Sequence, residues 1–232
     1  MKAIIPLAGP DFVHPTHGIK PLWDVDGEPL IKRAITSRPW WQKGLLTPEH
    51  MVFVLRRCPE AEIVSQKLDD WFPGSQRVWL SHLTGGALLS AMAGTALMGS
   101  DDAPLCIDLV DLLYDCAETI VPRFADKTVG GVVPWFTSTE SCYSYFELNA
   151  DGRVARAVEK QVISNIASAG TYFFRNTGTF LTAAAHSLKN PKAAAHKGVL
   201  FVCPAMNGVI AQGLTVDVAP VTNVRPISKL FH

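Results

Sequence analysis

The first 35 residues constrain the fold of this chain more than any other stretch. A short apolar run at residues 3–8 begins almost at the N-terminus and is broken by Gly9 and Pro10. A loop follows, a single lysine returns at Lys20, and an apolar helical pattern begins near Pro29. This order predicts a buried strand, a loop at its carboxyl end and then a helix. In open α/β sheets ligands bind at the carboxyl ends of strands, and a loop with free backbone N–H groups and one lysine suits phosphate there.

Strand and helix patterns alternate along the rest of the chain. We expect helices at residues 29–37, 60–72, 85–98, 180–187 and 204–212. We expect strands at residues 4–7, 51–55, 76–80, 104–107, 129–136, 143–148, 153–159, 169–174 and 215–221. Alternation in the first half predicts a parallel sheet, and a hairpin turn at residues 149–152 adds antiparallel strands. The sequence therefore predicts one α/β domain over residues 1–232, with a mixed, mainly parallel sheet flanked by helices.

Composition limits the classes of partner. The 232 residues are 48% hydrophobic and 18% charged, as expected of a protein with a large core. Lysine plus arginine and aspartate plus glutamate both number 21, so no basic surface for nucleic acid or anionic membrane is predicted. No apolar run approaches the ~18 residues of a membrane span or forms a signal-peptide core. The five scattered cysteines fit reduced, buried thiols, so we expect a cytoplasmic protein without nucleic-acid or membrane partners.

The N-terminal motifs resemble those of a known enzyme family. Residues 6–9 (Pro-Leu-Ala-Gly), 20–22 (Lys-Pro-Leu) and 27–31 (Gly-Glu-Pro-Leu-Ile) are similar to the opening of the sugar-phosphate nucleotidyltransferases, which have a Rossmann-like GT-A fold. The resemblance implies that Lys20 holds phosphate and that the backbone at Leu7, Ala8 and Gly9 holds the nucleotide. The loop departs from the family, because residues 10–13 (Pro-Asp-Phe-Val) stand where a second glycine and a triphosphate-facing arginine are expected. A purely structural alternative is a buried strand with an ordinary turn and a solvated lysine.

A second motif is the glycine pair in Thr84, Gly85 and Gly86. Glycines before a helix of small residues let backbone groups approach a flat ligand closely. In the family such a turn lies against the nucleobase. The alternative is an ordinary helix start with Thr84 as its N-cap.

A third motif is a buried strand that ends in aspartates, Asp108 and Asp111. A carboxylate at this edge of the sheet would supply the hard oxygen ligand that Mg²⁺ requires. The family has Gly-Asp or Ser-Asp after a hydrophobic strand, and Asp111 aligns best with that aspartate. Asp108 is the alternative ligand, or else a buried, hydrogen-bonded group, and both aspartates are alternatively helix caps.

Two further motifs lie in the second half. Residues 151–154 (Asp-Gly-Arg-Val) and 158–160 (Val-Glu-Lys) are similar to the family's hairpin, which implies that Glu159 binds acceptor hydroxyls and Lys160 the acceptor phosphate. The alternative is a solvated ion pair. Residues 164–174 match Ser-Asn-x-Ala-x-x-Gly-x-Tyr-x-Phe, which implies acceptor contacts from Asn165 and close ligand approach at Gly170. This pattern resembles most closely the branch found in capsule and surface-polysaccharide loci.

The resemblance predicts transfer of a nucleotidyl group from an NTP to a phosphorylated, sugar-like acceptor, with Mg²⁺ and release of pyrophosphate, for surface-polysaccharide precursor synthesis. In that reaction Lys20, Asp111 and Lys160 are the catalytic candidates. Two alternatives stay open, a non-catalytic binding homologue and a GT-A glycosyltransferase. The first is motivated by the missing arginine and by residues 225–230, which lack the family's C-terminal acidic residue. The second requires an Asp-x-Asp motif, whereas these aspartates are three residues apart. A homo-oligomer is also left open.

Overall fold

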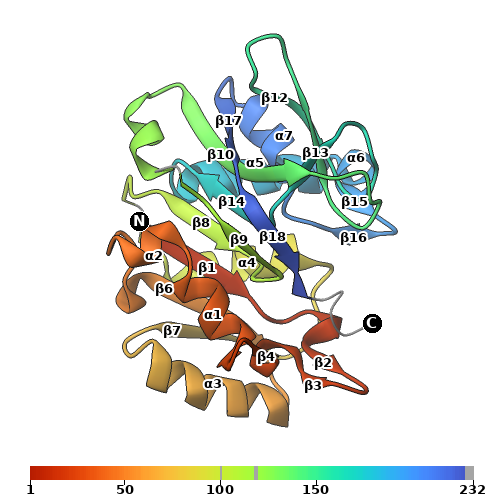
Figure 1. The fold of residues 1–232 in the computed structure, drawn as a ribbon. Helices are drawn as coiled ribbons and strands as arrows, with labels where there is room; N and C mark the ends of the chain where they lie inside the picture. The colour runs from red at the N-terminus through yellow and green to blue at the C-terminus, as the bar shows by residue number, and fades with distance from the viewer. Residues whose placement is uncertain (100, 118–119, 228–232) are drawn as a thin grey trace.

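The computed structural model describes residues 1–99, 101–117 and 120–227, which form an α/β fold with helices on both faces of a ten-stranded sheet (Figure 1). The strand order is β12-β11-β13-β10-β14-β8-β1-β6-β7, with β17 beside β10. Residues 228–230 of the C-terminal motif lie outside the described residues.

The N-terminal half of the sheet is parallel. It contains β1 (Lys2–Pro6), β6 (Met51–Arg56), β7 (Gln76–Leu80) and β8 (Leu105–Asp108). From β1 the chain moves outward to β6 and β7, and then returns to the other side of β1 as β8. The strand order therefore reverses between β1 and β8, which is where open α/β sheets bind ligands.

The second half of the sheet is built mainly from antiparallel pairs. The strands are β14 (Thr171–Phe174), β10 (Val129–Thr137), β13 (Ile166–Ser168), β11 (Tyr145–Leu148) and β12 (Val154–Val158). β17 (Thr215–Pro220) adds a parallel strand beside β10. The hairpin turn expected at residues 149–152 joins β11 to β12, and Asn149 Oδ1 accepts hydrogen bonds from the amides of Asp151 and Arg153. β14 pairs with β8 and so joins the two halves.

Helices cover both faces of the sheet. α1 (Leu30–Thr36), α2 (Pro39–Gln42) and α3 (Pro59–Trp71) pack on one face, and α4 (Ala87–Gly94), α5 (Thr177–Lys189) and α7 (Ala205–Ile210) pack on the other. Each face of the sheet has its own hydrophobic core, and alternate residues of a strand point into one core or the other. Ile5 and Phe53 lie in the core on the first face, and Ile4 and Val54 lie in the core on the second. The continuous apolar runs of these strands follow from burial on both faces.

Several short elements differ from the sequence prediction. β9 (Leu112–Asp115) and β18 (Thr222–Pro226) form an antiparallel pair that we did not expect. The expected helix at residues 85–98 is α4 followed by a 3₁₀ turn. The remaining elements are α6 (Pro191–Ala194), the two-residue strands β2 (Val13–His14), β3 (Gly18–Ile19), β4 (Asp24–Val25), β5 (Glu28–Pro29), β15 (Ala195–His196) and β16 (Val199–Leu200), and the 3₁₀ turns η1 (Pro10–Phe12), η2 (Lys20–Leu22), η3 (Pro48–His50), η4 (Thr95–Leu97) and η5 (Val121–Ala125).

The described cysteines are all free thiols, three of them buried. Among the described residues, no helix has the length and apolar character that crossing a membrane requires.

Candidate functional site

The strand-order reversal brings the loop after β1 beside the loop after β8. Gly9 and Asp11 follow β1, and Asp111 follows β8. Lys20, at the start of η2, lies between the two loops and contacts both of them. Leu7 does not offer a free amide here, because its backbone N–H donates to the Val54 carbonyl at 2.8 Å.

Lys20 is held by two carboxylates. Its Nζ lies 2.5 Å from Asp11 Oδ2 and 2.7 Å from Asp111 Oδ1, and its side chain is only 12% exposed. Burial alone would lower the pKa of Lys20, but the two carboxylates outweigh burial and raise that pKa. The ammonium is therefore charged at neutral pH, as a phosphate-binding lysine must be.

The two candidate aspartates have different environments. Asp108 is buried and paired with Arg38. The Arg38 Nε donates to Asp108 Oδ2 at 2.9 Å, and the Arg38 Nη2 donates to Asp108 Oδ1 at 3.2 Å. Asp108 also accepts hydrogen bonds from the Val110 amide and the Thr171 hydroxyl. The Asp111 side chain is 42% exposed and faces Lys20. Of the two, Asp108 is engaged in the core and Asp111 is accessible.

The turn between these aspartates is strained. Val110 has a φ of 53°, a left-handed conformation that is unfavourable for a β-branched residue. Such residues persist where the surrounding structure fixes them, and they cluster at functional sites. Here the Val110 amide donates a hydrogen bond to the Asp108 carboxylate, and the Val110 side chain is buried. The strained turn buries Asp108 and presents Asp111.

Arg38 is a residue that sequence reasoning missed. Besides Asp108, its guanidinium donates to the Leu112 carbonyl at 3.0 Å and lies 3.9 Å from the centre of the Tyr114 ring. The Tyr114 hydroxyl in turn lies 2.7 Å from the Thr171 hydroxyl. Arg38 thereby fixes the chain on both sides of the turn that carries Asp111. No sequence pattern marks it, because its partners are 70 or more residues away.

Glu159 and Lys160 follow β12. Glu159 accepts a hydrogen bond from the Ser144 hydroxyl, and burial raises the pKa of its carboxyl group. Lys160 has a φ of 51°, and its Nζ lies 4.9 Å from the centre of the Phe201 ring. Burial would raise the pKa of Asp11, but the charges of Lys20 and Lys160 contribute to a net lowering. Lys160 is therefore close enough to Asp11 to act on it electrostatically.

Gly170 lies against the Asp111 turn, whereas Asn165 lies at the surface. Gly170 joins β13 to β14 with a φ of 76°, and its carbonyl accepts a hydrogen bond from the Leu109 amide at 3.0 Å. Asn165 is exposed just before β13, and its backbone carbonyl accepts from the Ser138 amide. An acceptor contact for either residue stays a prediction.

The Gly85–Gly86 turn is packed against the chain itself. Gly86 has a φ of 135°, and a Cβ there would overlap the Leu200 carbonyl oxygen and lie 2.8 Å from the Leu200 backbone nitrogen. Gly85 accepts a hydrogen bond from the Leu200 amide at 2.8 Å. The close approach that requires glycine at residue 86 is thus made by Leu200, and nucleobase contact at this turn stays a prediction. The N-cap of α4 is Gly86, so the alternative role of Thr84 as N-cap is wrong, and Thr84 Oγ1 donates to the Gly86 carbonyl instead.

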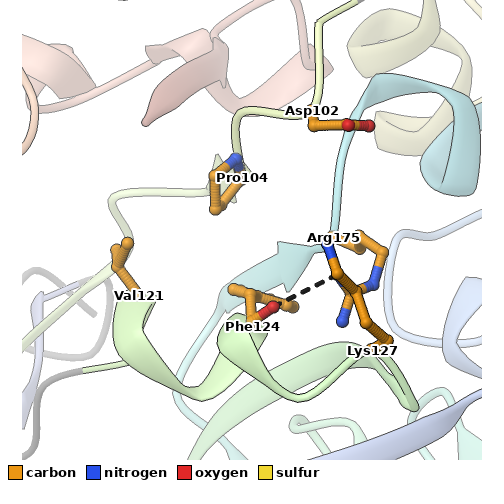
Figure 2. A pocket seen from close by; sticks show the side chains of 6 residues that line it. All are labelled: Asp102, Pro104, Val121, Phe124, Lys127 and Arg175. Carbon is orange, nitrogen blue, oxygen red and sulfur yellow. Dashed lines mark hydrogen bonds between the residues drawn. The ribbon is translucent and has the colours of Figure 1, made fainter.

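A pocket of about 470 Å³ lies at the opposite end of β8 (Figure 2). It is lined by Asp102, Pro104, Val121, Phe124, Lys127 and Arg175. Figure 2 shows Arg175 donating to the Phe124 carbonyl, and Arg175 also donates to the carbonyls of Asp126 and Val129. No candidate residue from the sequence lines this pocket, so it is separate from the Lys20–Asp111 site.

Comparison with known proteins places the fold. The sequence matches no protein-family model and no curated protein. Among solved structures, a nucleoside-diphosphate-sugar pyrophosphorylase from Vibrio cholerae RC9 is 18% identical with a TM-score of 0.78, over 97% of this chain and 94% of that one.

Two further structures have similar folds. A Bacillus anthracis protein assigned as a glucose-1-phosphate thymidylyltransferase, in complex with sucrose, is 15% identical with a TM-score of 0.72, over 96% of this chain and 87% of that one. A UDP-glucose pyrophosphorylase complexed with UDP-glucose is also 15% identical, with a TM-score of 0.66, over 95% of this chain and 91% of that one. The expected fold is thereby confirmed: this chain has the mixed α/β, Rossmann-like architecture of the nucleotidyltransferases.

Proposed function

We propose that this protein transfers a nucleotidyl group from an NTP to a phosphorylated sugar or sugar-like acceptor, as a step in making precursors of surface polysaccharides. The observation that carries the proposal is the meeting of Lys20 and Asp111 at the strand-order reversal, 2.7 Å apart. A charged lysine and an accessible carboxylate are the two groups that a metal-assisted nucleotidyl transfer needs at this position. The bound molecules named for two of the structural neighbours, sucrose and UDP-glucose, are compatible with such substrates.

In the proposed reaction a phosphate oxygen of the acceptor attacks the α-phosphorus of the NTP. The bond from that phosphorus to the oxygen bridging to the β-phosphate breaks, and pyrophosphate leaves with the bonding electrons. Lys20 holds the nucleotide phosphates, Lys160 orients the acceptor phosphate, and Glu159, Asn165 and Gly170 contact the rest of the acceptor. No general base is needed, because a phosphate monoester is already anionic at neutral pH. The chain's contribution is positioning and neutralisation of charge.

The donor set fits Mg²⁺. Mg²⁺ is commonly held by one or two carboxylates together with substrate phosphates, so the partly exposed carboxylate of Asp111 is sufficient as the protein ligand. The described residues contain no cluster of three or more His, Cys, Asp or Glu side chains that could hold a metal ion. When bound, Mg²⁺ would offset phosphate charge, and Asp108 is unsuited to this role because it is paired with Arg38.

The direct test is a screen for pyrophosphate release with each NTP, a panel of sugar phosphates and Mg²⁺. We expect release with at least one pair, and loss of release in Asp111→Asn. Exposed Asp70→Asn is the matched control, because it removes the same charge far along the sequence from the site and should leave release unchanged. Release that survives Asp111→Asn would remove Asp111 from the mechanism.

A non-catalytic binding protein on the same fold is the second candidate. It is favoured by one observation, the carboxylate of Asp11 in the loop where the family has its triphosphate-facing arginine. Nucleotide binding without pyrophosphate release in any combination would support it. The glycosyltransferase alternative is weakened, because pairing with Arg38 leaves Asp108 no part in an aspartate pair at the site.

A further inference from the structure

The side chain of Asp11 folds back over the loop that was expected to bind phosphate. Asp11 lies in η1, between Pro10 and the buried Phe12, so its backbone is fixed on both sides. Its Oδ1 is 2.7 Å from where a Cβ of Gly9 would stand, and its Oδ2 is 2.5 Å from Lys20 Nζ. A carboxylate group therefore already lies where the loop and the lysine would meet an anion.

The hydrogen-bonding capacity of Lys20 is nearly used. An ammonium group has three N–H donors, and two of them face the carboxylates of Asp11 and Asp111. A phosphate group that approached Lys20 would find at most one donor and would be repelled by two negative charges. Phosphate and Asp11 therefore cannot both make full use of Lys20.

Asp11 is the carboxylate that can leave. Its side chain is 67% exposed, compared with 42% for Asp111. Asp111 is presented by a turn that Arg38, Asp108 and Val110 hold in place. The Asp11 carboxylate is held by Lys20 and by its own backbone amide, with a weaker attraction from Lys160, so no partner packed in the core fixes it. A rotation of the exposed Asp11 side chain would free a donor on Lys20 without moving the backbone.

We propose that Asp11 is an internal competitor for the phosphate position, which must turn away from Lys20 before a phosphate-bearing ligand binds. This inference rests on the proposed function only in taking Lys20 as the phosphate-binding residue. It makes Asp11 a determinant of how tightly and how selectively the site takes polyanions. Ligands with enough phosphate charge to displace the carboxylate would bind, and singly charged anions would not.

The test is the affinity for inorganic pyrophosphate and tripolyphosphate, measured by calorimetry with a chelator present so that no divalent cation contributes. Asp11→Asn keeps the shape of the side chain and removes its charge. We expect it to tighten binding of both probes about tenfold, the factor that corresponds to about 1.4 kcal/mol. Asp70→Asn makes the same change in net charge on α3 and should bind like wild type. Lys20→Met should remove most binding, both as a single substitution and when it is combined with Asp11→Asn.

Three results would overturn the inference. They are equal or weaker probe binding by Asp11→Asn, an equal gain in Asp70→Asn, and no detectable binding by wild type and Asp11→Asn alike. The proposed function is assayed separately, by pyrophosphate release from NTPs with Mg²⁺. Tighter probe binding in Asp11→Asn without any release of pyrophosphate would uphold the inference and refute the proposed function. Release of pyrophosphate by the wild type, without tighter probe binding in Asp11→Asn, would support the proposed function and refute the inference about Asp11.

Discussion

At the scale of single residues, burial separates two aspartates that look alike in the sequence. We expect Asp108→Asn to lower the free energy of unfolding by about 3–5 kcal/mol, because it leaves the guanidinium of Arg38 buried without its counter-charge. Asp111→Asn should change that free energy by less than about 1 kcal/mol, since Asp111 is partly exposed. Urea unfolding of both variants measures the difference. Equal changes in unfolding free energy for the two variants would mean that the Arg38–Asp108 ion pair does not stabilise the fold.

Glu159 gives a residue-scale prediction about pH. Burial raises the pKa of Glu159 above its ordinary value of 4.5 in the folded protein. The folded state then holds a proton that the unfolded state has released, so this group's stabilising contribution is present below pH 4.5 and is lost as pH rises through the raised value. Glu159→Gln cannot titrate, and we expect the difference in unfolding free energy, variant minus wild type, to increase between pH 4 and pH 7. Urea unfolding at the two pH values provides the measurement, and a difference that stays constant with pH would contradict the raised pKa.

At the scale of elements, the contact between α5 and α7 depends on one glycine. A Cβ at Gly208 would lie 2.5 Å from the Ala183 carbonyl oxygen and 2.7 Å from the Ala183 Cα, so Gly208→Ala must push the two helices apart. We expect a loss of about 1–3 kcal/mol in unfolding free energy. Gly178→Ala is the matched control within α5, because its Cβ would make only an ordinary contact at 3.5 Å. That control should be neutral or slightly stabilising, and a similar loss in both variants would show that the helix contact is not the cause.

The elements that could be predicted from sequence are those whose signal is local. Strands buried on both faces, such as β1 and β6, appear as continuous apolar runs, and Asn149 with Gly152 marks the β11–β12 turn. The β9–β18 pair could not be predicted, because Thr222 and Asp115 come together only in the folded chain. Two residues of the candidate site could not be predicted for the same reason, because their contacts form only in the folded chain. Arg38 and Asp11 have no motif of their own, and their significance comes from partners that the fold supplies.

At the scale of the whole molecule, the two halves of the sheet supply different parts of the candidate site. The parallel half provides Lys20 and Asp111, for which we propose roles in holding nucleotide phosphate and Mg²⁺. The antiparallel half provides Glu159 and Lys160, for which we propose contacts with the acceptor. The halves meet where β8 pairs with β14 and where the Leu109 amide donates to Gly170. The strained turn that presents Asp111 is therefore anchored by both halves.

This division of the molecule leads to a prediction about turnover. In the proposed function, the loop after β1 lacks the arginine that the resemblance to the nucleotidyltransferases implies for stabilising the departing pyrophosphate, and this loop carries Asp11 instead. Arginine stabilisation of a transferring phosphoryl group is worth about 10³-fold or more in rate, so we expect a low kcat even when the protein is saturated with Mg²⁺–NTP. The measurement compares Mg²⁺–NTP binding by calorimetry with pyrophosphate release on the same sample. Because binding and release are measured together, an inactive preparation is recognised by its failure to bind. Fast release would show that another cation, such as Lys160, already supplies the missing charge, and Lys160→Met should then lower kcat while leaving NTP affinity unchanged.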